Sequence, residues 1–188
     1  NTSDKTRIPI FSENIKKLID KSEHFSMRHK GDINSLVSVI GEGYRDKIKF
    51  EFCPSIPYVG EVWKPKLNPN NKKFIAIEIK DDREWRRYHK IGKLKFYNHL
   101  TAFVKHCKEN KIPVCYMSHD GSKNFYKHLI SRGVKIPLLD NSSGVESKIM
   151  ENYSKVKTLF CSAGHSQMMA HGLGINTNIF VKTQITIN

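Results

Sequence analysis

Four short segments contain cationic, imidazole or small residues, which together are suited to binding an anion and moving a proton. They are Arg28-His29-Lys30-Gly31-Asp32, Lys80-Asp81-Asp82-Arg83-Glu84-Trp85-Arg86-Arg87, Ser118-His119-Asp120-Gly121 and Ser162-Ala163-Gly164-His165-Ser166-Gln167. Arginine and lysine hold carboxylates and phosphates, and histidine exchanges a proton near neutral pH. Each segment follows residues that predict a strand, so the four together predict a substrate site at one edge of a sheet.

The last segment is the sharpest, because its small residues lead from a strand into a helix. Such a turn exposes backbone N–H groups and the positive end of the helix dipole, which suit a phosphate or a carboxylate. Gly164 and Ser166 would line the start of the helix, and His165 could donate a proton to the bound anion or to a reacting carbon. We therefore predict that His165 is catalytic. The alternative is that Ala163-Gly164 only permits a tight turn and that His165 caps the helix locally.

The same segments supply candidate substrate-binding residues. These are Arg28, Lys30, Arg83, Arg86, Arg87, His119, Gly164 and Ser166. The arginines of the second segment could grip a carboxylate or a phosphate with two parallel hydrogen bonds, although a solvated charged loop has the same composition. An aspartate next to His119 could orient its imidazole, although Asp120-Gly121 is also ordinary turn chemistry.

Metal and cofactor chemistry is disfavoured by the sequence. The pairs Cys115 with His119 and Cys161 with His165 have a spacing that could build a metal site of two cysteines and two histidines. Cysteines in buried strands are usually inert packing residues, so we expect no metal. A Gly-x-Gly-x-x-Gly loop, a Walker loop and a Gly-x-Ser-x-Gly elbow are all missing from the sequence, which disfavours NAD, ATP and serine hydrolysis. We therefore expect no cofactor.

Apolar runs rich in β-branched and aromatic residues alternate with amphipathic stretches from end to end, and these elements must position the four segments. The pattern predicts strands at 24–28, 47–52, 74–79, 112–117, 134–139, 158–161 and 178–181. It predicts helices after a cap at Ser12 and at 31–40, 94–110, 122–131, 145–153 and 165–171. Such alternation is typical of a parallel sheet with crossover helices, whose ligands sit at the carboxyl ends of the strands. We expect one α/β, Rossmann-like three-layer domain over residues 1–188.

Composition and charge limit the kinds of partner and the compartment that we expect for the protein. The 188 residues include 32 Lys+Arg and 18 Asp+Glu, a formal charge of +14, with 38% hydrophobic residues that suffice for a core. A basic chain attracts polyanions and anionic substrates. Without an apolar run of about 18 residues, any membrane contact is expected to be peripheral. Four cysteines without a Cys-x-x-Cys pair indicate a reducing compartment, the cytoplasm. The start at Asn1 suggests a segment of a longer protein.

Two passages resemble the polysaccharide pyruvyl transferase family. The first runs from Phe25-Ser26-Met27-Arg28-His29-Lys30-Gly31-Asp32 through Val39-Ile40-Gly41 to Phe50-Glu51-Phe52-Cys53-Pro54, and is similar to that family's "SVRNDGS … IG … PDPGF". The second, YSKVKTLFCSAGHSQMMAHGLG, begins at Tyr153 and is similar to the family's "YY … VIGxRGHAQMIPFGLG". The resemblance covers nearly all of this chain, but only the carboxyl-terminal half of a typical member.

The resemblance implies one half of a GT-B-like fold, in which two Rossmann-type halves face each other across the active site. It implies transfer of a pyruvyl group from phosphoenolpyruvate, an anionic small-molecule donor, onto a sugar or oligosaccharide acceptor to form a ketal. An amino-terminal half would be a further partner. Within the family's Arg-Gly-His motif the chain keeps Gly164 and His165 and has Ala163 at the arginine position. Arg28 keeps the arginine of the first motif, and Cys53 replaces the aspartate of the family's "PDP".

Three other functions compete with this one. A glycosyltransferase of GT-B type would hold the diphosphate of a nucleotide sugar at the same sheet edge. A diverged, inactive relative would keep the fold without the chemistry. A basic nucleic-acid-binding module is disfavoured, because the lysines are spread along the chain and no nucleic-acid-binding signature is present.

Overall fold

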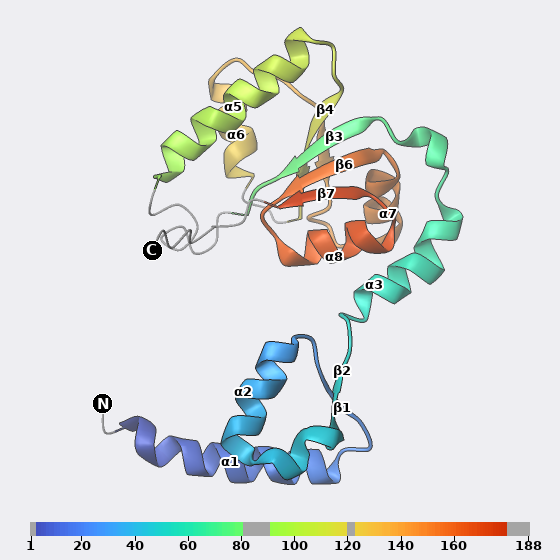
Figure 1. The fold of residues 1–188 in the computed structure, drawn as a ribbon. Coiled ribbons are helices and arrows are strands. Elements are labelled where there is room, and N and C mark those ends of the chain that lie inside the picture. The colour runs from blue at the N-terminus through green and yellow to red at the C-terminus, as the bar shows by residue number, and fades with distance from the viewer. Residues whose placement is uncertain (1–2, 81–90, 120–122, 180–188) are drawn as a thin grey trace. The chain divides into compact units, whose positions relative to one another are not determined.

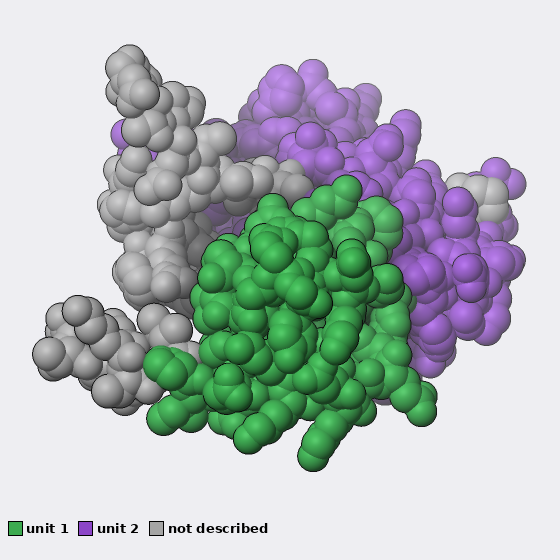
Figure 2. Space-filling model, turned by 60° about the horizontal axis from the view of Figure 1, so that its bottom comes forward, with its two compact units in different colours: residues 1–54 green, residues 55–188 purple. Residues whose placement is uncertain are grey.

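The computed structural model describes residues 3–80, 91–119 and 123–179. The chain divides into two compact units, residues 1–54 and residues 55–188, which are coloured separately in Figure 2. Each unit has its own hydrophobic core. A single domain over residues 1–188 stays a prediction.

The first unit is a small α/β motif. Helix α1 (Ser3–Lys21) precedes strand β1 (Phe25–Met27), helix α2 (Lys30–Ile40), the 3-10 helix η1 (Glu42–Lys47) and strand β2 (Ile48–Phe50). The two strands pair in parallel, with Phe25 opposite Ile48. Because Ile33, Val37 and Ile40 are spaced four and three residues apart, they form one stripe of α2 that packs with Ile19 and Ile48.

The start of the first helix differs from the prediction. The sequence predicts a cap at Ser12, whereas α1 already begins at Ser3. Ser12 is buried inside this helix, and its hydroxyl donates a hydrogen bond to the carbonyl of Val39 at 3.4 Å. Ser12 therefore links α1 to α2 and does not begin a helix.

The second unit is a mixed α/β domain built on a parallel sheet. It opens with short helical turns, α3 (Ser55–Tyr58), the π-helical η2 (Val59–Trp63), η3 (Lys64–Lys66) and η4 (Pro69–Asn71). The strands are β3 (Phe74–Glu78), β4 (Val114–Ser118), β5 (Leu138–Asp140), β6 (Val156–Cys161) and β7 (Asn176–Ile179). The helices between them are α5 (Lys93–Glu109), α6 (Asn124–Ser131), α7 (Glu146–Ser154) and α8 (Gly164–Gly172). All five strands run parallel, in the order β5-β4-β3-β6-β7.

The sheet separates two apolar cores, one on each face. Alternate residues of β4 point to opposite sides, so Val114 and Tyr116 join the core beneath α5 and α6. Cys115 and Met117 join the core formed with α7, α8 and η2. Figure 1 shows these helix pairs on opposite sides of the sheet. This three-layer, Rossmann-like arrangement confirms the fold class predicted from the sequence.

The single sheet expected from the sequence is in fact two sheets. Strands β1 and β2 pair with each other and do not join the five-stranded sheet. A central parallel strand must be covered on both faces. Strand β4 is buried at every position, whereas two of the three residues of β2 are exposed. The short, half-exposed strands of the first unit therefore do not fit the interior of the larger sheet.

The observed boundaries of some strands and helices also differ from the predicted ones. Residues 134–139 were expected as a strand, but β5 begins only at Leu138, because Pro137 has no N–H to donate to the ladder. The Pro137 carbonyl still accepts a hydrogen bond from Tyr116 N–H at 2.9 Å. Helices α5, α7 and α8 lie within one residue of their predicted bounds. Within the described ranges, no helix has both the length and the apolar character needed to cross a bilayer.

Candidate functional site

The order of the strands locates the place where a sheet of this kind binds ligands. From the central strand β3 the chain proceeds to β4 and β5 on one side, and then returns to β6 and β7 on the other. The connections therefore diverge between β3 and β6. In open parallel sheets, ligands bind beyond the carboxyl ends of the two strands at such a switch point. Here those ends are Glu78 and Cys161, which pair in register.

Backbone and side-chain hydrogen bonds hold these two strand ends together. Ser162 N–H donates to the carbonyl of Glu78 at 3.1 Å, and Lys80 N–H donates to the hydroxyl oxygen of Ser162 at 2.7 Å. The chain then turns at Ala163 into α8, which begins at Gly164. The predicted transition from strand to helix is therefore confirmed, and it lies at the switch point.

The start of α8 has the features that the sequence predicts for an anion site. Ala163 is the N-cap residue, and its side chain makes no capping hydrogen bond. Gly164 and His165 are exposed in the first turn, whereas Ser166 is only 2% exposed. Partial positive charge at a helix amino terminus favours an anion. His165 is therefore not the N-cap residue, and the choice between a catalytic and a local structural role for it stays a prediction.

A buried tyrosine connects the start of α8 to the end of β4. Tyr153 is fully buried, and its hydroxyl lies 2.9 Å from Nε2 of His119 and is hydrogen-bonded to the Ser166 side chain. Burial raises the pKa of Tyr153 far above its ordinary value, and the nearby Glu78 carboxyl adds to this rise. Tyr153 therefore remains a protonated phenol. Through it, the structure brings two predicted site residues, His119 and Ser166, to one side chain.

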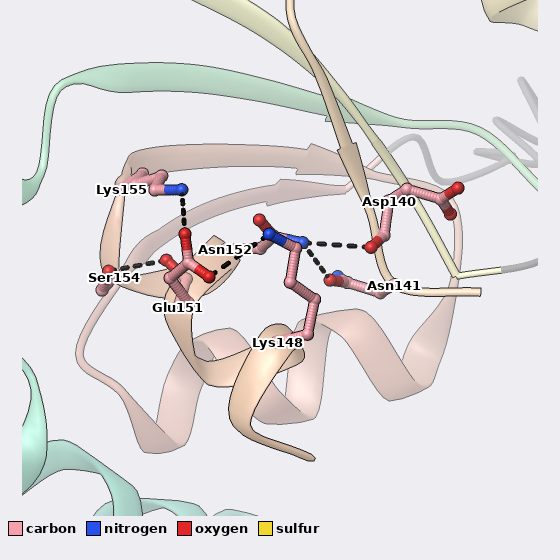
Figure 3. A network of polar contacts seen from close by, with 7 residues as sticks. All are labelled: Asp140, Asn141, Lys148, Glu151, Asn152, Ser154 and Lys155. Carbon is pink, nitrogen blue, oxygen red and sulfur yellow. Dashed lines mark hydrogen bonds and ion pairs between the residues drawn. The ribbon is translucent and has the colours of Figure 1, made fainter. Parts of the chain in front are cut away.

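Two asparagines extend this polar cluster to β5. Asn141 follows β5 and lies with its Nδ2 3.4 Å from Nε2 of His119. Asn152 of α7 donates from Nδ2 to the carbonyl of Asp140 at 3.1 Å and to Oδ1 of Asn141 at 2.7 Å. Figure 3 shows Asn152 pointing from α7 to the end of β5. Both asparagines are 2% exposed, so their hydrogen bonds are made away from bulk water.

The carboxylate of Asp140 has a different partner. Lys123 lies 2.5 Å from it, and Ser142 donates to it from its hydroxyl at 2.7 Å and from its N–H at 3.0 Å. The lysine first, and then the serine, lower the pKa of Asp140 to about 2. The carboxylate is therefore charged at every physiological pH.

We expect Lys123→Met to raise the pKa of Asp140 from about 2 towards its ordinary 3.8. Because the folded-state pKa lies below the unfolded one, the pair stabilises the fold above pH ~4 and loses this effect as pH falls towards ~2. The contribution is reduced by solvent, since the Asp140 side chain is 37% exposed. Carboxyl carbon chemical shifts titrated by NMR measure the pKa. Lys148→Met, in the separate pair with Glu151, is the matched control, and an unchanged Asp140 midpoint in Lys123→Met would contradict the assignment.

Two predicted cations lie in the first unit. Arg28 follows β1, and its Nη1 lies 3.8 Å from the sulfur of Cys53. Lys30 begins α2, with its Nζ 5.3 Å from the centre of the Phe50 ring. The sequence placed both at the edge of the same sheet as His165, whereas β1 belongs to the two-stranded sheet. Arg83, Arg86 and Arg87 lie outside the described residues, so the convergence of all five cations stays a prediction.

The cysteines are packing residues in this fold. All four are buried thiols. Burial raises the pKa of Cys115 and of Cys161 to about 12, with the Glu78 charge adding to the effect at Cys161. A metal binds the thiolate, which burial disfavours here. In the part of the chain that the structure describes, no three His, Cys, Asp or Glu side chains are grouped closely enough to hold a metal ion.

Sequence reasoning missed Tyr153, Asn141, Asn152 and Glu78. Tyr153 and Asn152 fall at the end of a predicted helix. There a tyrosine is ordinarily expected to pack in the core, and an asparagine to face solvent. A usable signal was the polar run Asp140-Asn141-Ser142, which directly follows a predicted strand just as the other site segments do. Glu78 lies within an apolar strand, and the sequence did not indicate that it is buried; the structure shows it 3% exposed.

The chain matches no protein-family model, no curated protein and no solved structure.

Proposed function

We propose that this chain is the donor-binding part of a carbohydrate-modifying transferase that moves a pyruvyl group from phosphoenolpyruvate onto a sugar. The observation that carries the proposal is the start of α8, where Gly164 and the exposed His165 stand at the switch point of a parallel sheet. The net charge of +14 and the motif resemblance support an anionic donor. The buried thiols agree with a reducing compartment, and we place the reaction in the cytoplasm.

The proposed reaction has a simple balance. One sugar hydroxyl adds to C2 of phosphoenolpyruvate while C3 takes a proton and becomes a methyl group. Phosphate then leaves C2, and a second hydroxyl of the sugar adds there to close the cyclic ketal. The two sugar hydroxyls lose two protons in all. One of these losses is offset by the proton that C3 takes up, and the other proton leaves with phosphate or solvent. The products are the ketal and inorganic phosphate.

Each proposed role follows from position and residue type. The backbone N–H groups at the start of α8 would hold the phosphate. His165, beside them, would protonate C3. Because Ala163 stands where the family has an arginine, binding the carboxylate would fall to Arg86 and Arg87, with Arg83 as a further cation. The sugar acceptor and the amino-terminal half that the resemblance implies complete the proposed assembly, and any contact with a membrane would be peripheral.

Ligand-dependent stability tests the proposal. We expect phosphoenolpyruvate to raise the melting temperature of the chain, by an amount that corresponds to about 2.7 kcal/mol at a hundred times its Kd. The double variant Arg86→Ala, Arg87→Ala should lose this shift and keep the melting temperature of the ligand-free chain. The double variant Lys95→Ala, Lys108→Ala removes the same charge from exposed positions of α5 and should respond as the wild type.

The alternatives give different results in the same assay. A shift with UDP- or GDP-sugars and none with phosphoenolpyruvate would replace the proposal with a glycosyltransferase. Sub-micromolar binding of nucleic acid with a steep dependence on salt would replace it with a nucleic-acid-binding module. No response to any of these ligands would leave an inactive relative.

A further inference from the structure

The polar cluster between β4, β5, α7 and α8 forms a continuous chain of hydrogen bonds around His119. In order, it runs through the Asp140 carbonyl, Asn152, Asn141, His119, Tyr153 and Ser166. We call these groups the His119 relay. Four of the side chains, those of Asn141, Asn152, Tyr153 and Ser166, are at most 2% exposed. Buried polar groups must be satisfied, so the direction of each hydrogen bond in the relay is restricted.

The donor and acceptor of each hydrogen bond in the relay follow from the group at its β5 end. The Asp140 carbonyl can only accept a hydrogen bond, so Asn152 must present its Nδ2 to that carbonyl. The second hydrogen of the same Nδ2 is donated to Asn141 at 2.7 Å, so the Asn141 atom that faces it must be Oδ1. These two amides therefore have one consistent orientation, which follows from the chemistry of the carbonyl.

This orientation turns a donor towards His119. With Oδ1 facing Asn152, the Asn141 amide presents Nδ2 to Nε2 of His119 at 3.4 Å. A proton on Nε2 would then face a second N–H donor. Without that proton, Nε2 accepts from Asn141 and also from the Tyr153 hydroxyl at 2.9 Å. Tyr153 is available as a donor because burial keeps its phenol protonated. Glu78 and Cys161 are the ionisable groups whose charge acts on Tyr153, and burial keeps Cys161 a thiol.

We infer that the His119 relay places the proton of the neutral His119 imidazole on Nδ1, and that Asn141, Asn152 and Tyr153 are positioning residues for it. This inference rests on the proposed function in one respect, the assignment of an anionic donor to this sheet edge. There His119 would contribute to donor binding, and proton transfer would fall to His165. The Ser166 end of the relay joins this histidine to the helix that carries His165.

Nitrogen-15 NMR of the ligand-free chain at about pH 8, above the ordinary histidine pKa, tests the inference directly. The His119 signals are assigned by their loss in His119→Gln. We expect the shifts of a protonated Nδ1 and an unprotonated Nε2. The near-isosteric Asn141→Asp keeps an acceptor for Asn152 and replaces the donor facing His119 with a carboxylate oxygen. It should place a proton on Nε2. Asn98→Asp, which adds the same charge at an exposed position of α5, should leave His119 unchanged.

Two outcomes would overturn the inference. One is a protonated Nε2 in the wild-type chain, and the other is an Nε2 signal that is the same in Asn141→Asp as in the wild type. If Asn141→Asp does not fold, Asn152→Ala replaces it, because Asn141 is then able to turn its amide over. Persistence of one unprotonated Nε2 signal in folded Asn152→Ala would count against the relay.

Donor binding is measured separately. His119→Phe should weaken phosphoenolpyruvate binding about 10–100-fold, because phenylalanine removes the polar atoms of the ring. Binding that is unchanged in His119→Phe would overturn the donor role of His119. If wild-type chain binds no phosphoenolpyruvate, the proposed function fails, whereas the tautomer of His119 is still decided by the ligand-free spectra.

Discussion

If the protein is the proposed pyruvyl transferase, replacing His165 with Gln will lower its turnover about 10²–10⁴-fold, the usual contribution of a positioned general acid. His165 is exposed in the first turn of α8. The proposed reaction binds the phosphate of the donor there and needs a proton at C3. Glutamine keeps much of the volume and hydrogen-bonding capacity of histidine but cannot exchange a proton. Because the backbone N–H groups of α8 are untouched, donor binding should be nearly preserved. Release of inorganic phosphate with phosphoenolpyruvate and an acceptor sugar measures the effect.

His171→Gln is the matched control for this experiment. His171 lies in the last turn of the same helix, is exposed, and hydrogen-bonds to Thr177 and Gln167. We expect its replacement to leave turnover within a factor of about two, since surface changes rarely exceed about 0.5 kcal/mol. Equal turnover in His165→Gln and His171→Gln would reduce His165 to a structural role.

Gly172→Ala will destabilise the second unit by about 3 kcal/mol, the upper range for inserting one methyl group into a packed interior. A Cβ on Gly172 would lie 2.6 Å from the carbonyl oxygen of Ile56 and 3.1 Å from Cβ of Val59. The first of these neighbours is backbone, which cannot move aside as a flexible side chain can. Helix α8 therefore depends on this glycine to pack against α3 and η2. Urea unfolding followed by circular dichroism gives the free energy change.

Gly164→Ala is the control, because it adds the same methyl group to the other end of α8. A Cβ on Gly164 would have no atom within 4 Å among the described residues. We expect its stability to change by less than about 1 kcal/mol, in the direction of the better helix propensity of alanine. If Gly172→Ala unfolds at the same urea concentration as Gly164→Ala, the close packing of α8 on α3 is wrong.

Much of the second unit could be predicted from local pattern. Residues 74–79 are apolar at nearly every position, which indicates a parallel strand covered on both faces, and the structure has β3 there with a buried carboxyl end. The helix start at Gly164 followed from small residues after an apolar run. The first unit shows where this reasoning fails, because residues 24–28 and 47–52 have strand character but pair with each other in a separate sheet.

The sequence by itself determined the type of most helices and strands of the second unit, the start of α8 and the residue types at the strand ends, because these depend on neighbours a few positions apart. Only the tertiary structure decided that the Tyr153 hydroxyl meets His119, 34 positions away, and that Asn152 turns the amide of Asn141 towards the same ring. Alternation along a strand tells which residues share a face of the sheet, but it carries no information on which strands are neighbours. The order β5-β4-β3-β6-β7 arises from packing over the whole domain, and that order places the ends of β4, β5 and β6 around one buried tyrosine.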